Sequence, residues 1–430
     1  MMSHRRQLKV GALARVEGSG ALRVVVAEGR VESAELDIYE PPRFFEAFLR
    51  GRAYTEPPDI TSRVCGICPV AYQTSACNAL EQLCGVTLDR PLSDLRRLLY
   101  CGEWISSHSL HIHLLHIPDF LGYPDAITLA ADHRELVEQG LAMKKAGNAL
   151  LEMIGGRAIH PINVRVGGFY SVPDRADFAA VTELLRRARD CAVSTARTAA
   201  QFDFPEFELE HQLLAATEPD RYAIDNGAVH TSTGLRFSTA DFSRHVRESQ
   251  VPHSTALHAM LDGERYLTGP LARYTLNQHQ LSPVARQVAA EIGLGVECRN
   301  PYRSILVRAV EVVHAIEEAL RLIADYDRPS RAAVAVTPRA GTGHGVSEAP
   351  RGLLYHRYEV DADGIVRSAT IIPPTSQNQS VMEDDLRRVV ADNLDLDDAA
   401  LATLCERAIR NYDPCISCSA HFLDVDVLRR

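Results

Sequence analysis

The chain has 430 residues, of which 46% are hydrophobic and 24% charged, and its 46 basic against 56 acidic side chains give a formal net charge of −10. This length and composition suit a globular protein with a large core, and the acidic balance excludes a nucleic-acid-binding function. The basic segment 1–10 has no apolar stretch behind it, and no apolar run reaches membrane-spanning length, so we expect a cytoplasmic protein without a signal peptide or membrane span.

The N-terminal region alternates apolar and polar side chains on either side of Gly29 and Arg30. Segments 22–28 and 31–38 are therefore expected to form a β-hairpin. From Pro42 the apolar period becomes helical, and the long patterns that follow, several of them rich in Ala and Leu, predict a central bundle of packed helices. These helices are expected over residues 69–85, 92–116, 127–154, 174–201, 277–291 and 302–326.

Two stretches interrupt the helical patterns. Residues 202–275 are rich in Pro and Gly and predict a smaller lobe of loops and short strands. Residues 329–380 contain a predicted hairpin near 355–372 and the glycine-rich segment 341–345, which lacks the spacing of a dinucleotide-binding loop. Since no repeat or low-complexity linker divides the chain, we predict a single domain over 1–430, of the α+β class and mainly α, with peripheral β and loop lobes.

The sequence Cys-x-x-Cys occurs twice, once from Cys65 to Cys68 and once from Cys415 to Cys418. Two pairs are a stronger signal than one, because a single pair also fits a disulfide, a redox dithiol or half of a zinc knuckle. Zinc ribbons separate their pairs by about 15–20 residues, whereas roughly 350 residues lie between these, so a whole domain would have to close around the site. Four thiolates select ions such as Zn, Ni, Fe or Cu(I). From the residues alone, a structural zinc site and a catalytic centre both stay open.

Other cysteines and histidines have simpler interpretations. Four histidines share one predicted helix, but no acidic residue stands where a His-Glu-x-x-His zinc site needs one, so we interpret them as a packed, hydrogen-bonded helix face. These are His108, His111, His113 and His116. Six cysteines show no ligand spacing, and we expect them to be buried small hydrophobic side chains. These are Cys77, Cys84, Cys101, Cys191, Cys298 and Cys405.

Distinctive short segments accompany the two cysteine pairs along the chain. They are Arg15-Val16-Glu17-Gly18, Arg43-Phe44-Phe45-Glu46, Gly155-Gly156-Arg157-Ala158-Ile159-His160-Pro161, Glu348-Ala349-Pro350-Arg351-Gly352, Pro374-Thr375-Ser376-Gln377-Asn378 and Asp413-Pro414-Cys415-Ile416-Ser417-Cys418-Ser419-Ala420-His421. Together with Cys65-Gly66-Ile67-Cys68 they resemble the large subunit of the nickel-iron hydrogenases, in the family's order and over nearly the whole chain. The phrase from Glu40 to Phe48 resembles most the soluble, multi-subunit, NAD(P)-linked branch, sometimes called sulfhydrogenases.

The resemblance implies the fold of the family's large subunit and a binuclear metal centre. Nickel would be held by all four cysteines, and an iron would carry CO and cyanide ligands. Cys65 and Cys415 would be terminal on nickel, whereas Cys68 and Cys418 would bridge to iron. The implied activity is reversible heterolytic oxidation of H2 and reduction of protons, with sulfur reduction as a further activity of that branch.

The resemblance also implies roles for residues around the metals. Glu17 matches the carboxylate that accepts a proton beside a terminal cysteine. Arg351 matches an arginine that lies over the metals, hydrogen-bonds a cyanide and helps to polarise H2. Thr375 matches a hydroxyl donor to the second cyanide, and Pro350 belongs to the same pocket. In one departure, Tyr72 stands where most relatives have histidine, and a phenol does not titrate near neutral pH.

The final histidine of the last segment has two implied roles. His421 and Glu46, with a backbone carbonyl near Ile371 and waters, resemble the ligands of a buried magnesium ion. Family precursors also lose the extension after this histidine once the metals are inserted, so the tail 422–430 is expected to be removed by a maturation protease.

The chain lacks a ferredoxin-like cysteine run and a Walker sequence, so electrons have no carrier within this polypeptide. We therefore expect an iron-sulfur small subunit as partner. By the resemblance, flavin and NAD(P) would be bound by further diaphorase subunits, and a maturation chaperone would assist metal insertion. Electrons from H2 would pass through the iron-sulfur subunit to NAD(P).

Two alternatives belong to other functional classes. A non-enzymatic subunit such as the quinone-side relative in respiratory complex I shares the fold, but it lacks the cysteine pairs that are present here. A zinc-stabilised binding protein would keep the pairs and hold zinc in place of nickel. Metal analysis separates this second alternative from a hydrogenase.

Overall fold

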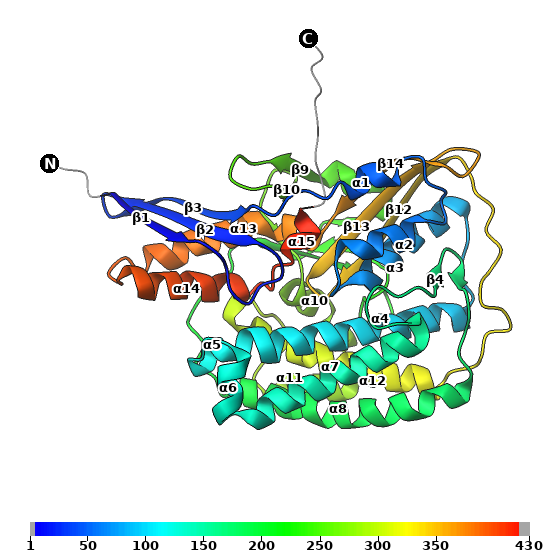
Figure 1. The fold of residues 1–430 in the computed structure, drawn as a ribbon, viewed down its shortest axis with the longest axis horizontal. Helices are drawn as coiled ribbons and strands as arrows, with labels where there is room; N and C mark the ends of the chain where they lie inside the picture. The colour runs from blue at the N-terminus through cyan, green and yellow to red at the C-terminus, as the bar shows by residue number, and fades with distance from the viewer. Residues whose placement is uncertain (1–4, 421–430) are drawn as a thin grey trace, which may run out of the picture.

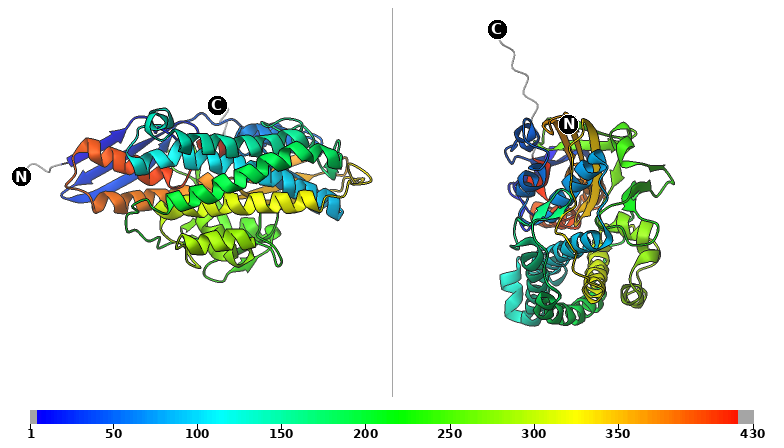
Figure 2. Two further views of the ribbon diagram at one scale, coloured as in Figure 1. Left: turned by 90° about the horizontal axis from the view of Figure 1, so that it is seen from below. Right: turned by 90° about the vertical axis from the view of Figure 1, so that its right-hand side faces the viewer.

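The computed structural model describes residues 5–420, and its largest layer consists of four long helices that run along the long axis (Figure 1). Helix α4 packs against α7 and α12, and α8 packs against the same two helices (Figure 2). The fold is α+β and mainly helical, as predicted. These helices are α4 (Arg90–Leu110), α7 (Arg134–Gly155), α8 (Phe178–Ala199) and α12 (Ser304–Ala324). Within residues 5–420, no helix has the length and apolar character needed to span a membrane.

Three predicted helices are continuous and three are divided. The continuous ones are α3 (Pro69–Cys84), α8 and α12. The prediction of one helix over 92–116 is wrong at its end, because α4 stops at Leu110 and a π-helical turn over His111–His116 leads into α5 (Ile117–Leu121).

The other two predicted helices are each divided into two, although their apolar pattern continues through the interruption. The predicted helix 127–154 is α6 (Ala126–Asp132) followed by α7, with His133 in a non-helical conformation between them. The predicted helix 277–291 is the end of α10 (Pro270–Asn277) followed by α11 (Pro283–Glu291). Helix α11 starts afresh because the Ser282 side chain accepts a hydrogen bond from the Ala285 N–H.

The predicted N-terminal hairpin is present as two strands of a three-stranded antiparallel sheet. Its turn has positive φ at Glu28 and Gly29, 52° and 73°, as a tight hairpin turn requires. The sequence pattern predicts neither the third strand, β1, nor the two helices α13 and α14 that pack against this sheet. The elements are β1 (Arg5–Val10), β2 (Gly20–Ala27), β3 (Arg30–Ile38), α13 (Pro374–Ala391) and α14 (Asp398–Arg410).

A second three-stranded sheet contains the predicted hairpin near 355–372 and the glycine-rich segment. Its strands are β12 (Gly341–Ala349), β13 (Gly352–Val360) and β14 (Val366–Ile372). Strand β12 packs directly on α3, and a Cβ atom at Gly343 or Gly345 would overlap the backbone of Ala79 or Ser75. The glycines therefore allow a helix and a strand to approach closely.

Residues 202–275 form the predicted lobe of loops and short strands, which projects from one side of the helix layer and is green to yellow-green in Figure 2. It contains a four-stranded sheet in the order β11-β6-β7-β8 and the antiparallel pair β9 and β10. The strands are β6 (Gln212–Thr217), β7 (Ala228–Thr231), β8 (Arg236–Phe237), β9 (Val246–Gln250), β10 (Leu257–Leu261) and β11 (Tyr266–Leu267).

The main hydrophobic core draws on both ends of the chain, from Leu8 to Cys418, and a smaller one joins the lobe to the second sheet. This sharing favours a single domain, which stays a prediction for 1–430 because residues 1–4 and 421–430 lie outside the described part. His421 and the tail 422–430 are therefore outside the described residues. The remaining elements are α1 (Phe45–Leu49), α2 (Pro57–Thr61), β4 (Val164–Arg165), β5 (Gly168–Phe169), α9 (Phe242–His245) and α15 (Ile416–Ser419).

Candidate metal centre

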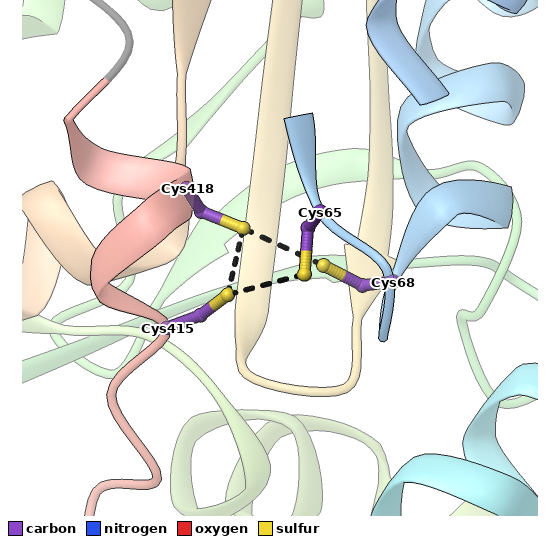
Figure 3. Close-up of side chains that lie close together, drawn as sticks. All are labelled: Cys65, Cys68, Cys415 and Cys418. Carbon is purple, nitrogen blue, oxygen red and sulfur yellow. Dashed lines mark hydrogen bonds between the residues drawn. The ribbon is translucent and has the colours of Figure 1, made fainter. Parts of the chain in front are cut away.

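The four cysteines of the two Cys-x-x-Cys pairs meet in the interior (Figure 3). The Sγ atoms of Cys65 and Cys415 lie 3.4 Å apart, those of Cys68 and Cys418 3.5 Å, and those of Cys415 and Cys418 2.8 Å. Cys68 precedes the first residue of α3, and Cys415 precedes the first residue of α15. Two helix starts far apart in the sequence therefore present their sulfurs to one point.

The chemistry of this quartet fits a soft or borderline metal cation. All four side chains are buried, and their sulfurs lie within 4.8 Å of one another. Burial raises the pKa of the Cys415 and Cys418 thiols, because a buried thiolate loses its hydration and repels the sulfurs beside it. A bound cation of suitable softness removes that penalty and holds the thiols deprotonated. The donor set fits nickel, iron and zinc alike.

Backbone and arginine contacts hold the two cysteine loops together. The guanidinium of Arg43 donates from Nη2 to the carbonyl of Val64 at 2.7 Å and to the carbonyl of Ser417, so one side chain bridges both loops. The Arg43 N–H also donates to the carbonyl of Ala420 at 3.0 Å. These contacts set the distance between the two cysteine pairs.

The start of α3, immediately after Cys68, is fixed by a buried carboxylate. Glu103 of α4 accepts hydrogen bonds from the N–H groups of Val70 at 2.6 Å and Ala71 at 3.1 Å. Its pKa is raised well above the ordinary value, chiefly by burial. Because these N–H groups have no partner inside the helix, the carboxylate satisfies them and anchors the Cys68 end of α3.

Glu17 lies directly against the sulfur of Cys415. Its Oε2 is 3.1 Å from the Cys415 Sγ and accepts a hydrogen bond from the Ser417 N–H at 3.0 Å. The Glu17 carbonyl accepts from the Ile416 N–H at 3.0 Å, so the backbone of the N-terminal segment is paired with the start of α15. Burial and the Cys65 sulfur raise the pKa of the Glu17 carboxyl. A carboxyl placed in this way can exchange a proton with a thiol sulfur.

Arg351 and Thr375 also lie close to the quartet. Arg351 donates from Nε to the Asp413 carbonyl at 2.9 Å and from Nη2 to the Asp413 carboxylate at 3.2 Å. Its Nη1 is buried and has no hydrogen-bond partner among the described residues, which leaves a donor for a bound group. Thr375 accepts a hydrogen bond from the Cys415 N–H at 3.0 Å, and its own hydroxyl proton is left to donate.

A fully buried ion network supports the Arg351 loop. Arg273 pairs with Glu311 at 2.8 Å and with Glu348 at 3.2 Å, and none of the three side chains is exposed. It also donates to the carbonyls of Ala349 at 2.7 Å and Pro350 at 2.9 Å, directly before Arg351. The sequence gives no local sign of this role, because Arg273, Glu311 and the segment 348–350 are far apart in the chain.

Arg273→Met is expected to lower the free energy of unfolding by about 3–5 kcal/mol, because two buried carboxylates lose their shared cation. Unfolding in urea followed by circular dichroism measures the change. Arg186→Met, at an exposed position on α8, is the control and should change the free energy by less than about 0.5 kcal/mol. Equal stability of the two variants would contradict the proposed importance of the network.

A family model described as nickel-dependent hydrogenase matches residues 43–139 and 254–421. The chain belongs to the nickel-dependent hydrogenase family. Sulfhydrogenase 2 subunit alpha of Pyrococcus furiosus is 32% identical over 97% of this chain and 99% of the relative, and sulfhydrogenase 1 subunit alpha of that organism is 31% identical over 96% and 97%. A solved structure of an NAD+-reducing [NiFe]-hydrogenase matches with a TM-score of 0.86 and 29% identity over 97% of this chain and 99% of that chain.

The family membership separates the alternatives that the residues alone leave open. The chain is a catalytic large subunit of a nickel-iron hydrogenase, and the buried quartet is a donor set that fits the two metals of that family. The zinc-stabilised binding protein and the non-enzymatic subunit are not supported. The predicted family, fold and enzyme class are thereby confirmed.

Three other residues singled out from the sequence are Glu46, Ile371 and Tyr72. The Glu46 carboxylate of α1 accepts a hydrogen bond from the Ile371 N–H at 2.7 Å, so these two predicted magnesium ligands are adjacent. Tyr72, on the first turn of α3, is buried, and its pKa is raised well above the ordinary value by burial and by the nearby Cys418 and Cys68 sulfurs. A neutral phenol beside these sulfurs can donate to them but cannot relay a proton as imidazole does.

The four histidines that share a predicted helix contact different partners. His108 faces Glu311 at 3.0 Å, His111 the Arg410 carbonyl at 3.0 Å, His116 the Asn411 side chain at 3.0 Å, and His113 the Thr195 hydroxyl at 3.2 Å. These separate hydrogen bonds agree with a packed helix face rather than a metal site. Of the six cysteines with no predicted ligand role, five are buried and Cys191 is half-buried.

Proposed function

We propose that this subunit splits H2 heterolytically with Glu17 as the proton acceptor, in a multi-subunit enzyme that transfers the electrons to NAD(P). The observation that carries the proposal is the 3.1 Å contact between the Glu17 Oε2 and the Cys415 Sγ at the edge of the buried quartet. A nickel-iron pair, when bound, supplies the site at which H2 is polarised. The chain supplies the thiolates, the base and the walls of the pocket.

The proposed ligand assignment is the one that the family resemblance implies. Cys65 and Cys415 would hold the nickel alone, and Cys68 and Cys418 would hold both the nickel and an iron with CO and cyanide ligands. Support comes from the pairing of the sulfurs, since Cys68 and Cys418 lie 3.5 Å apart on one side and Cys65 and Cys415 3.4 Å apart on the other (Figure 3). The side with Cys415 is the one that Glu17 contacts.

Donors for the iron ligands are proposed from the groups that the protein leaves available. The unpartnered Nη1 of Arg351 fits a hydrogen bond to one cyanide, and the Thr375 hydroxyl fits a hydrogen bond to the other. Pro350, directly before Arg351, would belong to the same pocket, as the family resemblance implies. Arg273 positions this segment through the carbonyls of Ala349 and Pro350.

A magnesium ion at Glu46, Ile371 and His421 is part of the same proposal. Its support is the contact of the Glu46 carboxylate with the Ile371 backbone, and a carboxylate with a carbonyl and waters is an ordinary magnesium environment. His421 is outside the described residues, so its part in the site comes from the family resemblance. We also propose removal of the tail 422–430 during maturation.

Electrons need partner subunits to leave this chain. Among residues 5–420, the only group of cysteines that could hold a metal is the quartet itself, so no iron-sulfur relay is supplied by this part of the chain. We propose an iron-sulfur small subunit and flavin- and NAD(P)-binding diaphorase subunits in a cytoplasmic complex. The similarity to a hydrogenase described as NAD+-reducing and to sulfhydrogenase alpha subunits supports that choice, with sulfur as a further electron acceptor.

Infrared spectroscopy of the purified complex is expected to show the stretching bands of iron-bound CO and cyanide, together with about one nickel per chain. The same preparation should oxidise H2 with an artificial electron acceptor and with NAD+ or NADP+. A preparation made with its maturation proteins that holds zinc and no nickel, and shows no such bands, would refute the assignment. Activity with the artificial acceptor alone would refute only the NAD(P) coupling.

A further inference from the structure

A second group of metal-ligating side chains lies away from the cysteine quartet. His253, His258 and Glu383 place two imidazole nitrogens and a carboxylate oxygen within 4.8 Å of one another. His253 lies in the loop between β9 and β10, His258 on β10 and Glu383 on α13. The hydrogenase reaction described above uses none of the three.

The distances within this group suit a small divalent ion. The Nε2 of His253 is 2.8 Å from the Glu383 Oε1, and the Nε2 of His258 is 3.8 Å from the same oxygen. Donors about 2.0 Å from a tetrahedral zinc ion lie about 3.3 Å from each other. The two distances lie on either side of that value, so changes of about half an ångström in each distance would admit the ion.

His258 is the observation that separates this group from a simple ion pair. Its side chain is 9% exposed, and its Nε2 has no hydrogen-bond partner among the described residues. Burial lowers the pKa of His258 to about 4, so the ring is neutral near pH 7 and its Nε2 can offer a lone pair. A buried nitrogen without a partner costs free energy unless a ligand satisfies it.

Hydrogen bonds hold the donors in place, and one of the three, His253, lies at a surface cavity. Glu383 also accepts a hydrogen bond from the Leu36 N–H of β3 at 2.9 Å. One turn earlier on α13, Gln379 donates to the Ser254 hydroxyl at 3.0 Å and so fixes the loop that carries His253. His253 lines a surface cavity of about 740 Å3 between this loop and the end of β3.

We propose that His253, His258 and Glu383 bind a Zn²⁺ ion that joins the β9–β10 hairpin to α13. Two imidazoles and one carboxylate are a known set of three protein ligands for zinc, and such a set leaves the fourth position of the ion to water. The ion would be structural, because it would fasten the lobe to the helix whose first turn carries Thr375, and no substrate path to it is implied.

The test uses the purified complex, treated with a mild chelator and then supplied with Zn²⁺ alone. Mass spectrometry of the metals should give one zinc per nickel, and zinc X-ray absorption should show nitrogen and oxygen ligands without sulfur. His258→Gln and His253→Gln should each weaken Zn²⁺ binding by more than about 100-fold, since even groups that merely support a metal ligand contribute 10- to 100-fold. Both variants should keep their nickel and their H2 oxidation, which shows that they are folded.

His211→Gln is the matched control. His211 pairs with Asp384, the neighbour of Glu383 on α13, at 3.1 Å, but within residues 5–420 this pair has no third metal-ligating donor. This variant should bind zinc as the unchanged protein does. The proposal is wrong if the unchanged complex takes up no zinc, if His258→Gln binds it equally well, or if the zinc has sulfur ligands. The last result would place zinc in the cysteine quartet and count against the nickel-iron assignment instead.

Discussion

Cys415→Ser is expected to leave the subunit with almost no nickel and to reduce H2 oxidation by more than about 100-fold, because a serine oxygen is a poor ligand for a borderline metal. Cys415 has three close polar neighbours at the quartet. It lies 3.4 Å from the Cys65 Sγ, 2.8 Å from the Cys418 Sγ and 3.1 Å from the Glu17 carboxylate. Its loss therefore removes a proposed nickel ligand together with the neighbour of the proposed base.

Mass spectrometry of the metals and an H2 uptake assay with an artificial acceptor measure the two effects. Cys405→Ser is the control, since Cys405 is another buried cysteine near the C-terminal end of the described chain but lies on α14 outside the quartet. It should keep its nickel and its activity. A nickel-replete, active Cys415→Ser protein would contradict the role given to this sulfur.

The residues that we propose to carry the chemistry could be predicted from the sequence because each lies in a short, distinctive segment. Cys65 and Cys68 are separated by two residues, as are Cys415 and Cys418, and Glu17 stands in an equally recognisable four-residue phrase. The convergence of the two pairs is a tertiary feature that spacing alone does not require. It was expected because of the family resemblance, and the contacts of Figure 3 agree with it.

The supporting residues could not be identified in this way, because their partners are distant in the sequence. Arg43 joins Val64 to Ser417, which lie on different cysteine loops, and no pattern around Arg43 indicates either carbonyl. Glu103 lies in the second half of α4, and the apolar pattern that predicts this helix does not indicate which groups Glu103 contacts. Buried polar side chains satisfy backbone groups wherever the fold brings them, so their roles become visible only in three dimensions.

The secondary structure that was missed has the same kind of cause. Strand β1 is short, and of its six side chains only Leu8 is buried, so it has no marked alternation. The helix α13 begins with polar residues such as Gln377 and Gln379, which are nevertheless buried because they hydrogen-bond backbone groups of β13 and β3. An apolar period cannot detect a helix whose buried face is largely polar.

Glu17→Gln is expected to preserve nickel and iron but to lower the rate of H2/D2O exchange by about 100- to 10,000-fold, the range that a positioned acid or base contributes. Glutamine has nearly the same shape, and its amide oxygen can still accept the hydrogen bond that the Ser417 N–H gives to the Glu17 Oε2 at 3.0 Å. It cannot take up a proton from the Cys415 sulfur. The substitution therefore separates the proton step from the binding of the metals.

Exchange measured by mass spectrometry of the gas phase tests this, and the infrared bands of CO and cyanide report whether the metal site is intact. Glu17→Asp keeps an acid but moves it away by one methylene, so it should recover part of the exchange, which a purely structural role of Glu17 would not predict. Glu32→Gln serves as the control, because Glu32 is an exposed carboxylate on β3 that pairs only loosely with Arg5 at 3.4 Å. Exchange in Glu17→Gln at the rate of this control, with both metals present, would remove Glu17 from the proton path and leave the Cys415 sulfur without an adjacent base among residues 5–420.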